Sequence, residues 1–117
     1  MTGVSAPSPR RGEVWWVLLD PTLGSEIRKT RPCLVMTNDI LNQRRRTVVV
    51  VPFSTALVGN PPLQVTVVCA GRRAVAVTDQ IRSVSKLRLR QRIGTVTAED
   101  LKTVEDGLRQ ILELDSH

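Results

Sequence analysis

The side chains that could do chemistry in this chain are arginines, hydroxyls and a few carboxylates. His117 is the only histidine, and no segment matches a phosphate-binding glycine loop or a histidine-based zinc motif. These absences exclude Ser-His-Asp and Cys-His catalysis. The remaining set suits phosphoryl transfer on RNA. RNA carries its own nucleophile, the 2′-hydroxyl, and a guanidinium offers positive charge and two aligned donors to the phosphate oxygens.

Proton transfer is the demanding step for such a set of residues. Arginine as a residue type holds its proton too tightly to be an easy general base, so a carboxylate has to take that part. Candidates outside the C-terminal helix are Asp20, Glu26, Asp39 and Asp79. Among them, we expect Glu26 to be the carboxylate that serves as base.

Length and composition indicate a single soluble domain. We expect it to span 10–117, after a disordered tail at 1–9 that is rich in Ser, Pro and Gly. Cys33 and Cys69 lie in apolar runs, which favours buried thiols in a reducing compartment over a disulfide or a metal site. Because no apolar stretch approaches the roughly 18 residues that span a bilayer, we expect a cytoplasmic protein without a membrane partner.

The charge is unevenly distributed. The chain carries a net charge of +6, yet residues 1–97 hold 15 basic and 5 acidic side chains, a net of +10. A field of that size raises the local concentration of polyanions such as nucleic acid. Most of the basic residues are arginines, which favour bidentate contact with phosphate. A solubilising surface without a partner is the alternative interpretation.

Short apolar runs bounded by turn residues predict a sheet. The expected strands are 14–19, 32–37, 47–55, 63–69, 74–77, 79–84 and 92–96. We expect loops at 21–30, from Asn38 onward and at the 44–46 arginines, and a short helical turn at 86–90. Trp15 and Trp16 are adjacent on a strand and should face opposite sides, one in the core and the other at an interface.

One helix is predicted, beginning after Thr97. Thr97 is a suitable N-cap, and an apolar face repeats at helical spacing over Leu101, Val104, Leu108, Ile111 and Leu112. Gly107 within it costs about 1 kcal/mol relative to Ala, which indicates close packing there. Short strands joined by Gly and Pro turns, with one terminal helix, fit a mainly β, small compact barrel.

Four segments resemble the MazF/PemK (Kid) family of toxin ribonucleases. They are 11–15 with 20–26, then 29–35 with Asn38 and Asp39, then 50–55, and finally 78–84 followed by 92–94. The match runs from about Arg10 to Leu114. Each segment alone is a weak signal, whereas their order and spacing together are specific.

The resemblance implies a fold and an activity. The fold is an SH3-like barrel, shared with the gyrase poison CcdB, with a C-terminal α-helix. The activity is that of a homodimer that cuts single-stranded RNA without a metal or other cofactor, leaving a 2′,3′-cyclic phosphate and a 5′-hydroxyl. The implied partner is a cognate antitoxin whose acidic C-terminal segment lies across the RNA site.

The resemblance also assigns roles to residues. Arg31 matches the family's catalytic arginine before proline, and Ser54 matches its hydroxyl residue, usually threonine, after the third strand. Serine lacks the methyl that restricts the side chain, so Thr55 is an alternative hydroxyl. Glu26 matches a loop glutamate tied to activity in some members. The expected catalytic residues are therefore Arg31, Ser54 and Glu26.

A second group of residues is expected to bind the RNA. It comprises Arg28, Lys29, Thr30, Thr55, Asp79, Gln80 and Arg82. Asp79 matches an aspartate implicated in the Kid branch, but that branch has an arginine two residues earlier where this chain has Val77. Its role, catalytic or structural, therefore stays open.

Two other functions compete with the ribonuclease. One is a non-catalytic toxin, which uses the barrel to bind a protein target as CcdB does. Arg31 and Ser54 count against it, since a binder does not need that pair. The other is a general nucleic-acid-binding barrel, which would bind DNA and RNA alike and give no products. The RNA recognition sequence cannot be decoded from the loops.

Overall fold

The computed structural model describes residues 8–19, 29–55 and 59–114. These described residues form seven strands, two α-helices and two 3-10 turns. In order they are β1 (Glu13–Leu19), β2 (Lys29–Val35), α1 (Asp39–Arg44), β3 (Thr47–Ser54), β4 (Gln64–Cys69), β5 (Arg72–Val77), η1 (Thr78–Gln80), β6 (Arg82–Ser85), η2 (Lys86–Arg88), β7 (Leu89–Thr95) and α2 (Ala98–Ile111). The expected mainly β fold with a C-terminal helix is confirmed.

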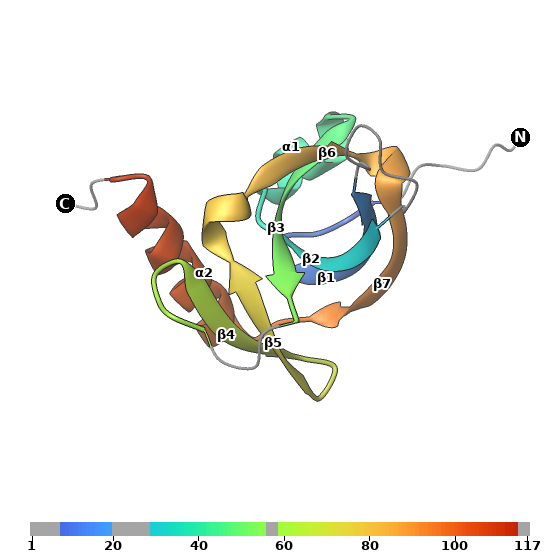
Figure 1. The fold of residues 1–117 in the computed structure, drawn as a ribbon. Helices are drawn as coiled ribbons and strands as arrows, with labels where there is room; N and C mark the ends of the chain where they lie inside the picture. Colours follow the sequence, from blue (N-terminus) through green and yellow to red (C-terminus); the bar gives the residue numbers. More distant parts are fainter. Residues whose placement is uncertain (1–7, 20–28, 56–58, 115–117) are drawn as a thin grey trace, which may run out of the picture.

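The strands form one antiparallel sheet in the order β4-β5-β3-β2-β1-β7, with β6 paired to β3. Figure 1 shows this sheet curled into a small barrel, with α2 beside β4. The two edge strands, β4 and β7, approach each other closely. A Cβ added to Gly94 of β7 would lie 3.2 Å from the Cys69 sulfur of β4. Among the described helices, none is long and apolar enough to cross a membrane.

Both faces of β3 are buried, so this strand separates two apolar clusters. Val48 and Val50 point into one apolar cluster, and Val51 and Phe53 point into the other. Since alternate residues of a strand face opposite sides, a strand between two cores needs a continuous apolar run, and 48–53 is such a run. β3 leaves this double core at Ser54, which is only half-buried.

The C-terminal helix begins as predicted. The Thr97 side chain accepts a hydrogen bond from the Asp100 N–H at 3.0 Å, which caps α2. Val104 and Leu108 are buried in the larger cluster, and Leu101 and Ile111 pack against it. Leu112 is the exception in the predicted apolar face, because it lies after the helix and is half exposed.

Several predicted boundaries were wrong. A helix, α1, stands where a break at Asn38-Asp39 and a loop were expected; the Asn38 side chain caps it by accepting from the Leu41 N–H. β2 begins at Lys29, inside the expected loop, and 78–80 form η1 rather than strand. β7 also begins three residues early, at Leu89. Pairing with β1 lengthens β2 and β7 beyond their apolar runs, and the Asn38 cap favours α1 over a loop.

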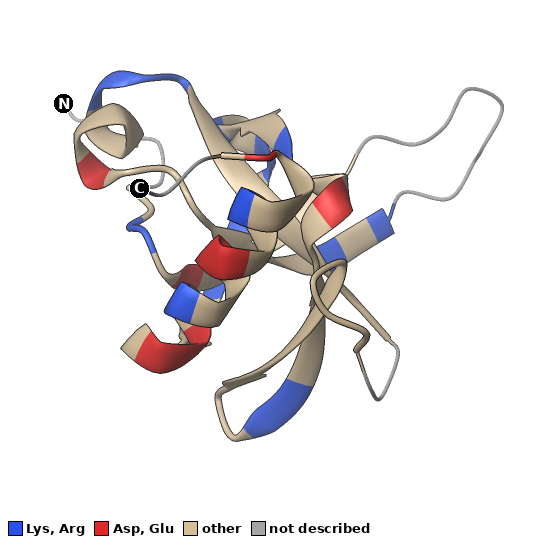
Figure 2. Cartoon of the chain, turned by 90° about the vertical axis from the view of Figure 1, so that its left-hand side faces the viewer, with Lys and Arg blue, Asp and Glu red and all other residues tan. Residues whose placement is uncertain are grey.

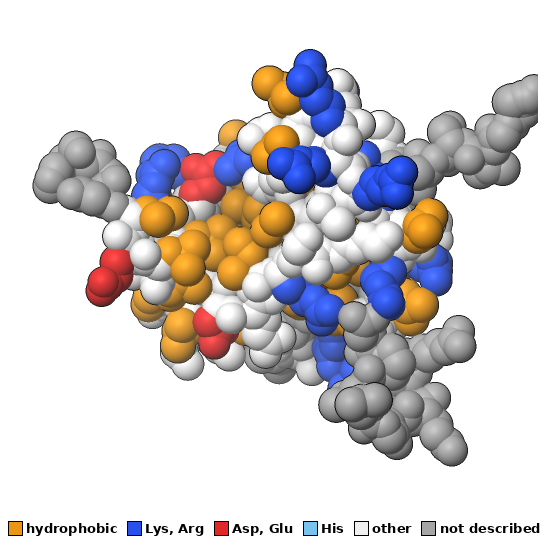
Figure 3. All heavy atoms as spheres, turned by 90° about the horizontal axis from the view of Figure 1, so that it is seen from above, with side chains coloured by type: hydrophobic (Ala, Val, Ile, Leu, Met, Phe, Trp, Pro, Cys, Tyr) orange, Lys and Arg blue, Asp and Glu red, His pale blue; other side chains and the backbone are white. Residues whose placement is uncertain are grey.

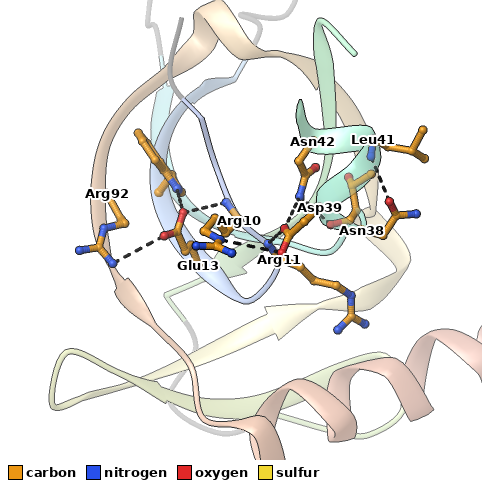
Figure 4. A network of polar contacts seen from close by, with 10 residues as sticks. Arg10, Arg11, Glu13, Asn38, Asp39, Leu41, Asn42 and Arg92 are labelled. Carbon is orange, nitrogen blue, oxygen red and sulfur yellow. Dashed lines mark hydrogen bonds and ion pairs between the residues drawn. The ribbon is translucent and has the colours of Figure 1, made fainter. Parts of the chain in front are cut away.

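Asp39 holds the N-terminal side of α1 to the chain before β1 (Figure 4). Its Oδ1 accepts the Arg11 N–H at 2.7 Å and the Asn42 Nδ2 at 3.1 Å. The hydrogen bond from the Arg11 backbone is the largest cause that holds the pKa of the Asp39 carboxyl below its ordinary value, and the hydrogen bond from the Asn42 side chain is the next. This network anchors the connection that leads from β2 into β3.

We expect Asp39→Asn to lower stability at neutral pH and to lose this effect in acid. A depressed native pKa means that the ionised carboxylate stabilises the fold above its unfolded pKa of about 3.9, and this stabilisation disappears as pH falls through the native pKa. Urea midpoints of both proteins between pH 7 and pH 3 provide the measurement.

Asp106→Asn is the matched control, because that carboxylate contacts only exposed Lys102 and Arg109 on the surface of α2. Its midpoint should follow that of the unmodified protein at every pH. A constant difference between Asp39→Asn and the unmodified protein, from neutral pH into acid, would show that the carboxylate charge contributes nothing.

Candidate active site

Strand register places Arg31 across from Ser54. β2 and β3 pair Val35 with Val50, and Cys33 with Pro52. Continuing that antiparallel register by two residues brings Arg31 opposite Ser54, and directly opposed residues share one face of a sheet. The β2–β3 ladder ends at Cys33, whereas the opposite edge of β3 pairs Phe53 and Ser54 with β5. The two strands therefore separate at this pair.

A cleft of about 440 Å³ lies where the strands separate. It is lined by Trp16, Lys29, Thr30, Arg31, Pro32, Phe53, Ser54, Thr55, Arg73 and Ala74. An adjoining hollow of about 180 Å³ is lined by Arg31, Phe53, Ser54, Thr55, Val77 and Gln80. We call the two together the arginine cleft.

The polar groups of the arginine cleft suit an anion. Lys29, Arg31 and Arg73 supply three positive charges, and Ser54 and Thr55 supply hydroxyls. No carboxylate is present among the described residues that line it. Guanidinium groups and hydroxyls around one hollow can hold a phosphate and stabilise extra negative charge on it.

An apolar wall completes the cleft. Trp16 is 39% exposed and lines it, and the same ring borders a neighbouring slot of about 470 Å³ with Phe53, Ala74 and Ile93. Trp15, on the opposite face of β1, packs against the smaller core cluster, as the alternation of strand residues predicts. A flat apolar surface beside cations fits a group that joins a ring to a phosphate, as a nucleotide does.

The structure gathers most of the predicted site residues in this one place. Six of them line the arginine cleft: Lys29, Thr30, Arg31, Ser54, Thr55 and Gln80. Asp79 is exposed on η1 and is absent from the lining, and Arg82 lies on β6 opposite Val50, also outside it. Glu26 and Arg28 lie outside the described residues.

Sequence reasoning missed Arg73. This residue lies beside the β4–β5 turn, where a basic side chain is the ordinary pattern of a solvent-exposed hairpin. It reaches the cleft because β5 lies beside β3 and pairs Ala76 with Phe53 and Val75 with Ser54. That pairing joins residues 21 and 23 positions apart, and no local sequence pattern predicts it.

Cys33 lies next to Arg31 on β2 but is not a candidate nucleophile. It is fully buried, and burial raises the pKa of its thiol to about 12, although the positive charges of Arg82 and Arg31 act in the opposite direction. The Cys33 thiol donates instead to the Arg31 carbonyl at 3.6 Å. Elsewhere in the described chain, no three His, Cys, Asp or Glu side chains group as metal ligands.

Comparison with known proteins gives consistent matches over nearly the whole chain. Residues 10–112 match the family described as the PemK-like, MazF-like toxin of type II toxin–antitoxin systems. Endoribonuclease MazF9 of Mycobacterium tuberculosis is 36% identical over 90% of this chain and 97% of its own. Endoribonuclease toxin MazF of Escherichia coli K12 is 33% identical over 93% and 98%.

Solved structures share the fold. A mycobacterial endoribonuclease in complex with its cognate antitoxin superposes with a TM-score of 0.76, at 24% identity, over 93% of this chain and 99% of that one. MazF from Deinococcus radiodurans gives a TM-score of 0.77 at 24% identity, over 92% and 99%. These likenesses establish the barrel with its C-terminal helix.

Proposed function

This chain belongs to the PemK-like, MazF-like family of toxins of type II toxin–antitoxin systems, and we propose that it cuts RNA in its arginine cleft. It is an endoribonuclease toxin, as its relatives are named. The non-catalytic alternative, a barrel that only binds a protein target, has no such support. The observation that supports this choice of site is that Arg31 and Ser54 line the same cationic cleft.

In the proposed reaction the 2′-hydroxyl of single-stranded RNA attacks the adjacent phosphorus and the bond to the 5′-oxygen breaks. The products are a 2′,3′-cyclic phosphate and a 5′-hydroxyl. The Arg31 guanidinium binds the non-bridging oxygens and stabilises the charge that grows on them. Ser54 donates a hydrogen bond to the same phosphate, and Glu26 is the proposed base that takes the proton of the 2′-hydroxyl. The departing 5′-oxygen takes its proton from solvent water.

This mechanism assigns no step to a metal ion or another cofactor. The nucleophile belongs to the substrate, and Arg31, Lys29 and Arg73 provide positive charge around the phosphate. Arginine and lysine remain cationic at neutral pH, so the electrostatic part of catalysis is built into the chain itself.

The same cations suit an antitoxin. We propose that an acidic segment of a cognate antitoxin covers the arginine cleft, whose positive charges would attract it. A mycobacterial endoribonuclease of the same fold has been solved in complex with its cognate antitoxin. We also propose a homodimer. It is supported by an apolar groove of about 450 Å³ beside α2, where hydrophobic side chains gather (Figure 3), with Leu112 and Leu114 about half exposed on it. Cleavage of messenger RNA places the proposed action in the cytoplasm.

The proposal is tested by incubating the purified protein with a long unstructured RNA in EDTA and sequencing the ends that carry a 5′-hydroxyl. We expect discrete fragments with a shared short sequence at the cut. RNA that binds and stays intact would contradict the ribonuclease. Equal, salt-sensitive binding of DNA and RNA without products would indicate the general binding barrel.

We expect Ser54→Ala to slow cleavage about tenfold and Thr55→Ala to slow it less than threefold. Both hydroxyls line the cleft, but the strand register opposes only Ser54 to Arg31. A hydrogen bond to a charged phosphate is worth about 1.5 kcal/mol, or roughly a factor of ten in rate. Single-turnover rates on one labelled RNA provide the measurement.

Ser83→Ala is the matched control, since Ser83 is an exposed serine on β6. Its rate should equal that of the unmodified protein, and Ser54→Thr should retain most of the activity because it keeps the hydroxyl. A larger loss in Thr55→Ala than in Ser54→Ala would transfer the working hydroxyl to the neighbour.

A further inference from the structure

A second basic cavity, of about 510 Å³, lies at the other end of β3. It is lined by Gln43, Arg44, Arg45, Arg46, Ser85, Lys86 and Leu87. Four of these residues are cations, and the described lining includes no carboxylate. Figure 2 shows the basic run that joins α1 to β3 at one end of the molecule and the basic pair of the β4–β5 hairpin at the other. We call this hollow the distal cavity.

Lys86 makes the distal cavity more than a solvated patch. Its side chain lines the cavity while the residue is only 8% exposed, and none of the described ion pairs includes it. The stem of Lys86 is buried and its ammonium opens to the cavity, so four positive charges gather around one hollow, where their mutual repulsion favours the binding of an anion. The distal cavity is therefore a positively charged recess that is large enough to hold an anion.

The walls of the recess are held by the backbone. The Lys86 N–H donates to the Arg46 carbonyl at 2.9 Å, and Thr47 pairs with Ser85 where β3 meets β6. The Arg45 N–H donates to the Leu41 carbonyl at 2.8 Å, which ties the arginines to the end of α1. The cations are thus mounted on a preformed frame, which reduces the entropy lost on binding.

The helix end explains only part of the cluster. Arg44 lies in the last turn of α1, where a cation is favourable without any ligand. Arg46 and Lys86 lie outside that helix, so its dipole does not account for them. The one acidic residue of α1, Asp39, is at the opposite end of the helix and is bound to Arg11 and Asn42.

We propose that the distal cavity binds a backbone phosphate of the RNA beyond the segment held in the arginine cleft. This proposal rests on the proposed function. Ser54 and Thr47 are seven residues apart on β3, roughly 23 Å at 3.3 Å per residue, a distance that a strand of several nucleotides can span. A recessed ammonium among guanidiniums fits a compact tetrahedral anion, and contact with phosphate would strengthen binding without reading sequence.

The test compares short and long RNA that cannot be cut. Fluorescent 2′-O-methyl oligouridylates of about 3 and about 20 nucleotides lack a free 2′-hydroxyl, and their Kd values are read by anisotropy across a salt series. Only the longer probe can reach both sites. We expect Lys86→Met to weaken binding of the long probe about tenfold and to leave the short probe unchanged. The log–log salt slope should fall by about 0.7, the value for one phosphate contact on a single strand.

Two further variants keep the result decisive. Arg45→Gln with Arg46→Gln alters only exposed side chains of the distal cavity, so it gives the answer even when Lys86→Met folds poorly. Lys102→Met with Arg109→Gln removes two charges from α2 and should leave both probes unchanged. Equal weakening of both probes, or none, overturns the proposal. A labelled acidic peptide is measured in the same way. If Lys86→Met still binds the long RNA probe but no longer binds the peptide, the cavity serves a protein partner and the proposal is overturned.

Failure of this inference is distinguishable from failure of the proposed function. The probes are uncleavable, so their binding does not depend on catalysis, and cleavage of ordinary RNA is scored separately. If the protein cuts RNA and shows no preference for the long probe, only the proposal for the distal cavity is overturned.

Discussion

Arg31→Ala should slow RNA cleavage at least a hundredfold while the fold is retained. A factor of one hundred corresponds to about 2.7 kcal/mol of barrier, the size expected when a charged donor to a transition-state oxygen is removed. Arg31 lies at the start of β2, outside both core clusters, so its truncation leaves no cavity in the core. Single-turnover rates on a labelled RNA, with thermal unfolding to verify the fold, provide the measurement.

Two variants separate chemistry from charge. Arg31→Lys keeps the positive charge and loses the planar pair of donors, so we expect a rate between those of Arg31→Ala and the unmodified protein. Arg90→Ala removes an exposed arginine of β7 whose side chain donates to the Leu87 carbonyl, and it should cut normally. A folded Arg31→Ala protein with full activity would remove Arg31 from the site and leave the endoribonuclease assignment standing.

Gly107→Ala should destabilise the protein by about 1–2 kcal/mol, the opposite of its usual effect. Within a helix, replacing glycine by alanine normally gains about 1 kcal/mol. Here a Cβ would lie 2.8 Å from the Pro62 carbonyl oxygen and 3.3 Å from the Thr78 methyl. The first contact is with backbone, which moves only at a cost, and overpacking of this kind costs about 1–3 kcal/mol.

The clash also reaches the functional site. Thr78 begins η1 and donates from its hydroxyl to the Pro62 carbonyl at 2.7 Å, and Gln80 at the end of η1 lines the arginine cleft. Thermal unfolding should show a decrease in Tm of several degrees. Gln110→Ala, at an exposed position of α2, is the control and should leave the Tm nearly unchanged. A Tm that rises in Gly107→Ala would contradict the close packing of α2 on η1.

Local signals explain which features were predictable. The cap at Thr97 and the repeat of Val104 and Leu108 require only neighbouring residues, and α2 begins where they indicate. The buried run at 48–53 likewise announces β3. By contrast, α1 was missed because an asparagine after an apolar run can either end a strand or cap a helix, and the sequence alone does not decide between these roles.

The amino-acid sequence determined the chemistry open to this protein: arginine and hydroxyl groups on a basic chain, which suits phosphate and leaves imidazole out. Tertiary structure alone decided which of these groups meet. Arg31, Ser54 and Arg73 line one cleft because β3 lies between β2 and β5 and pairs with both. Lys86 joins the arginines of 44–46 through the pairing of β6 with β3. Strand partners are selected by the burial that distant segments achieve together. The hydrophobic periodicity within one segment therefore does not predict its partner.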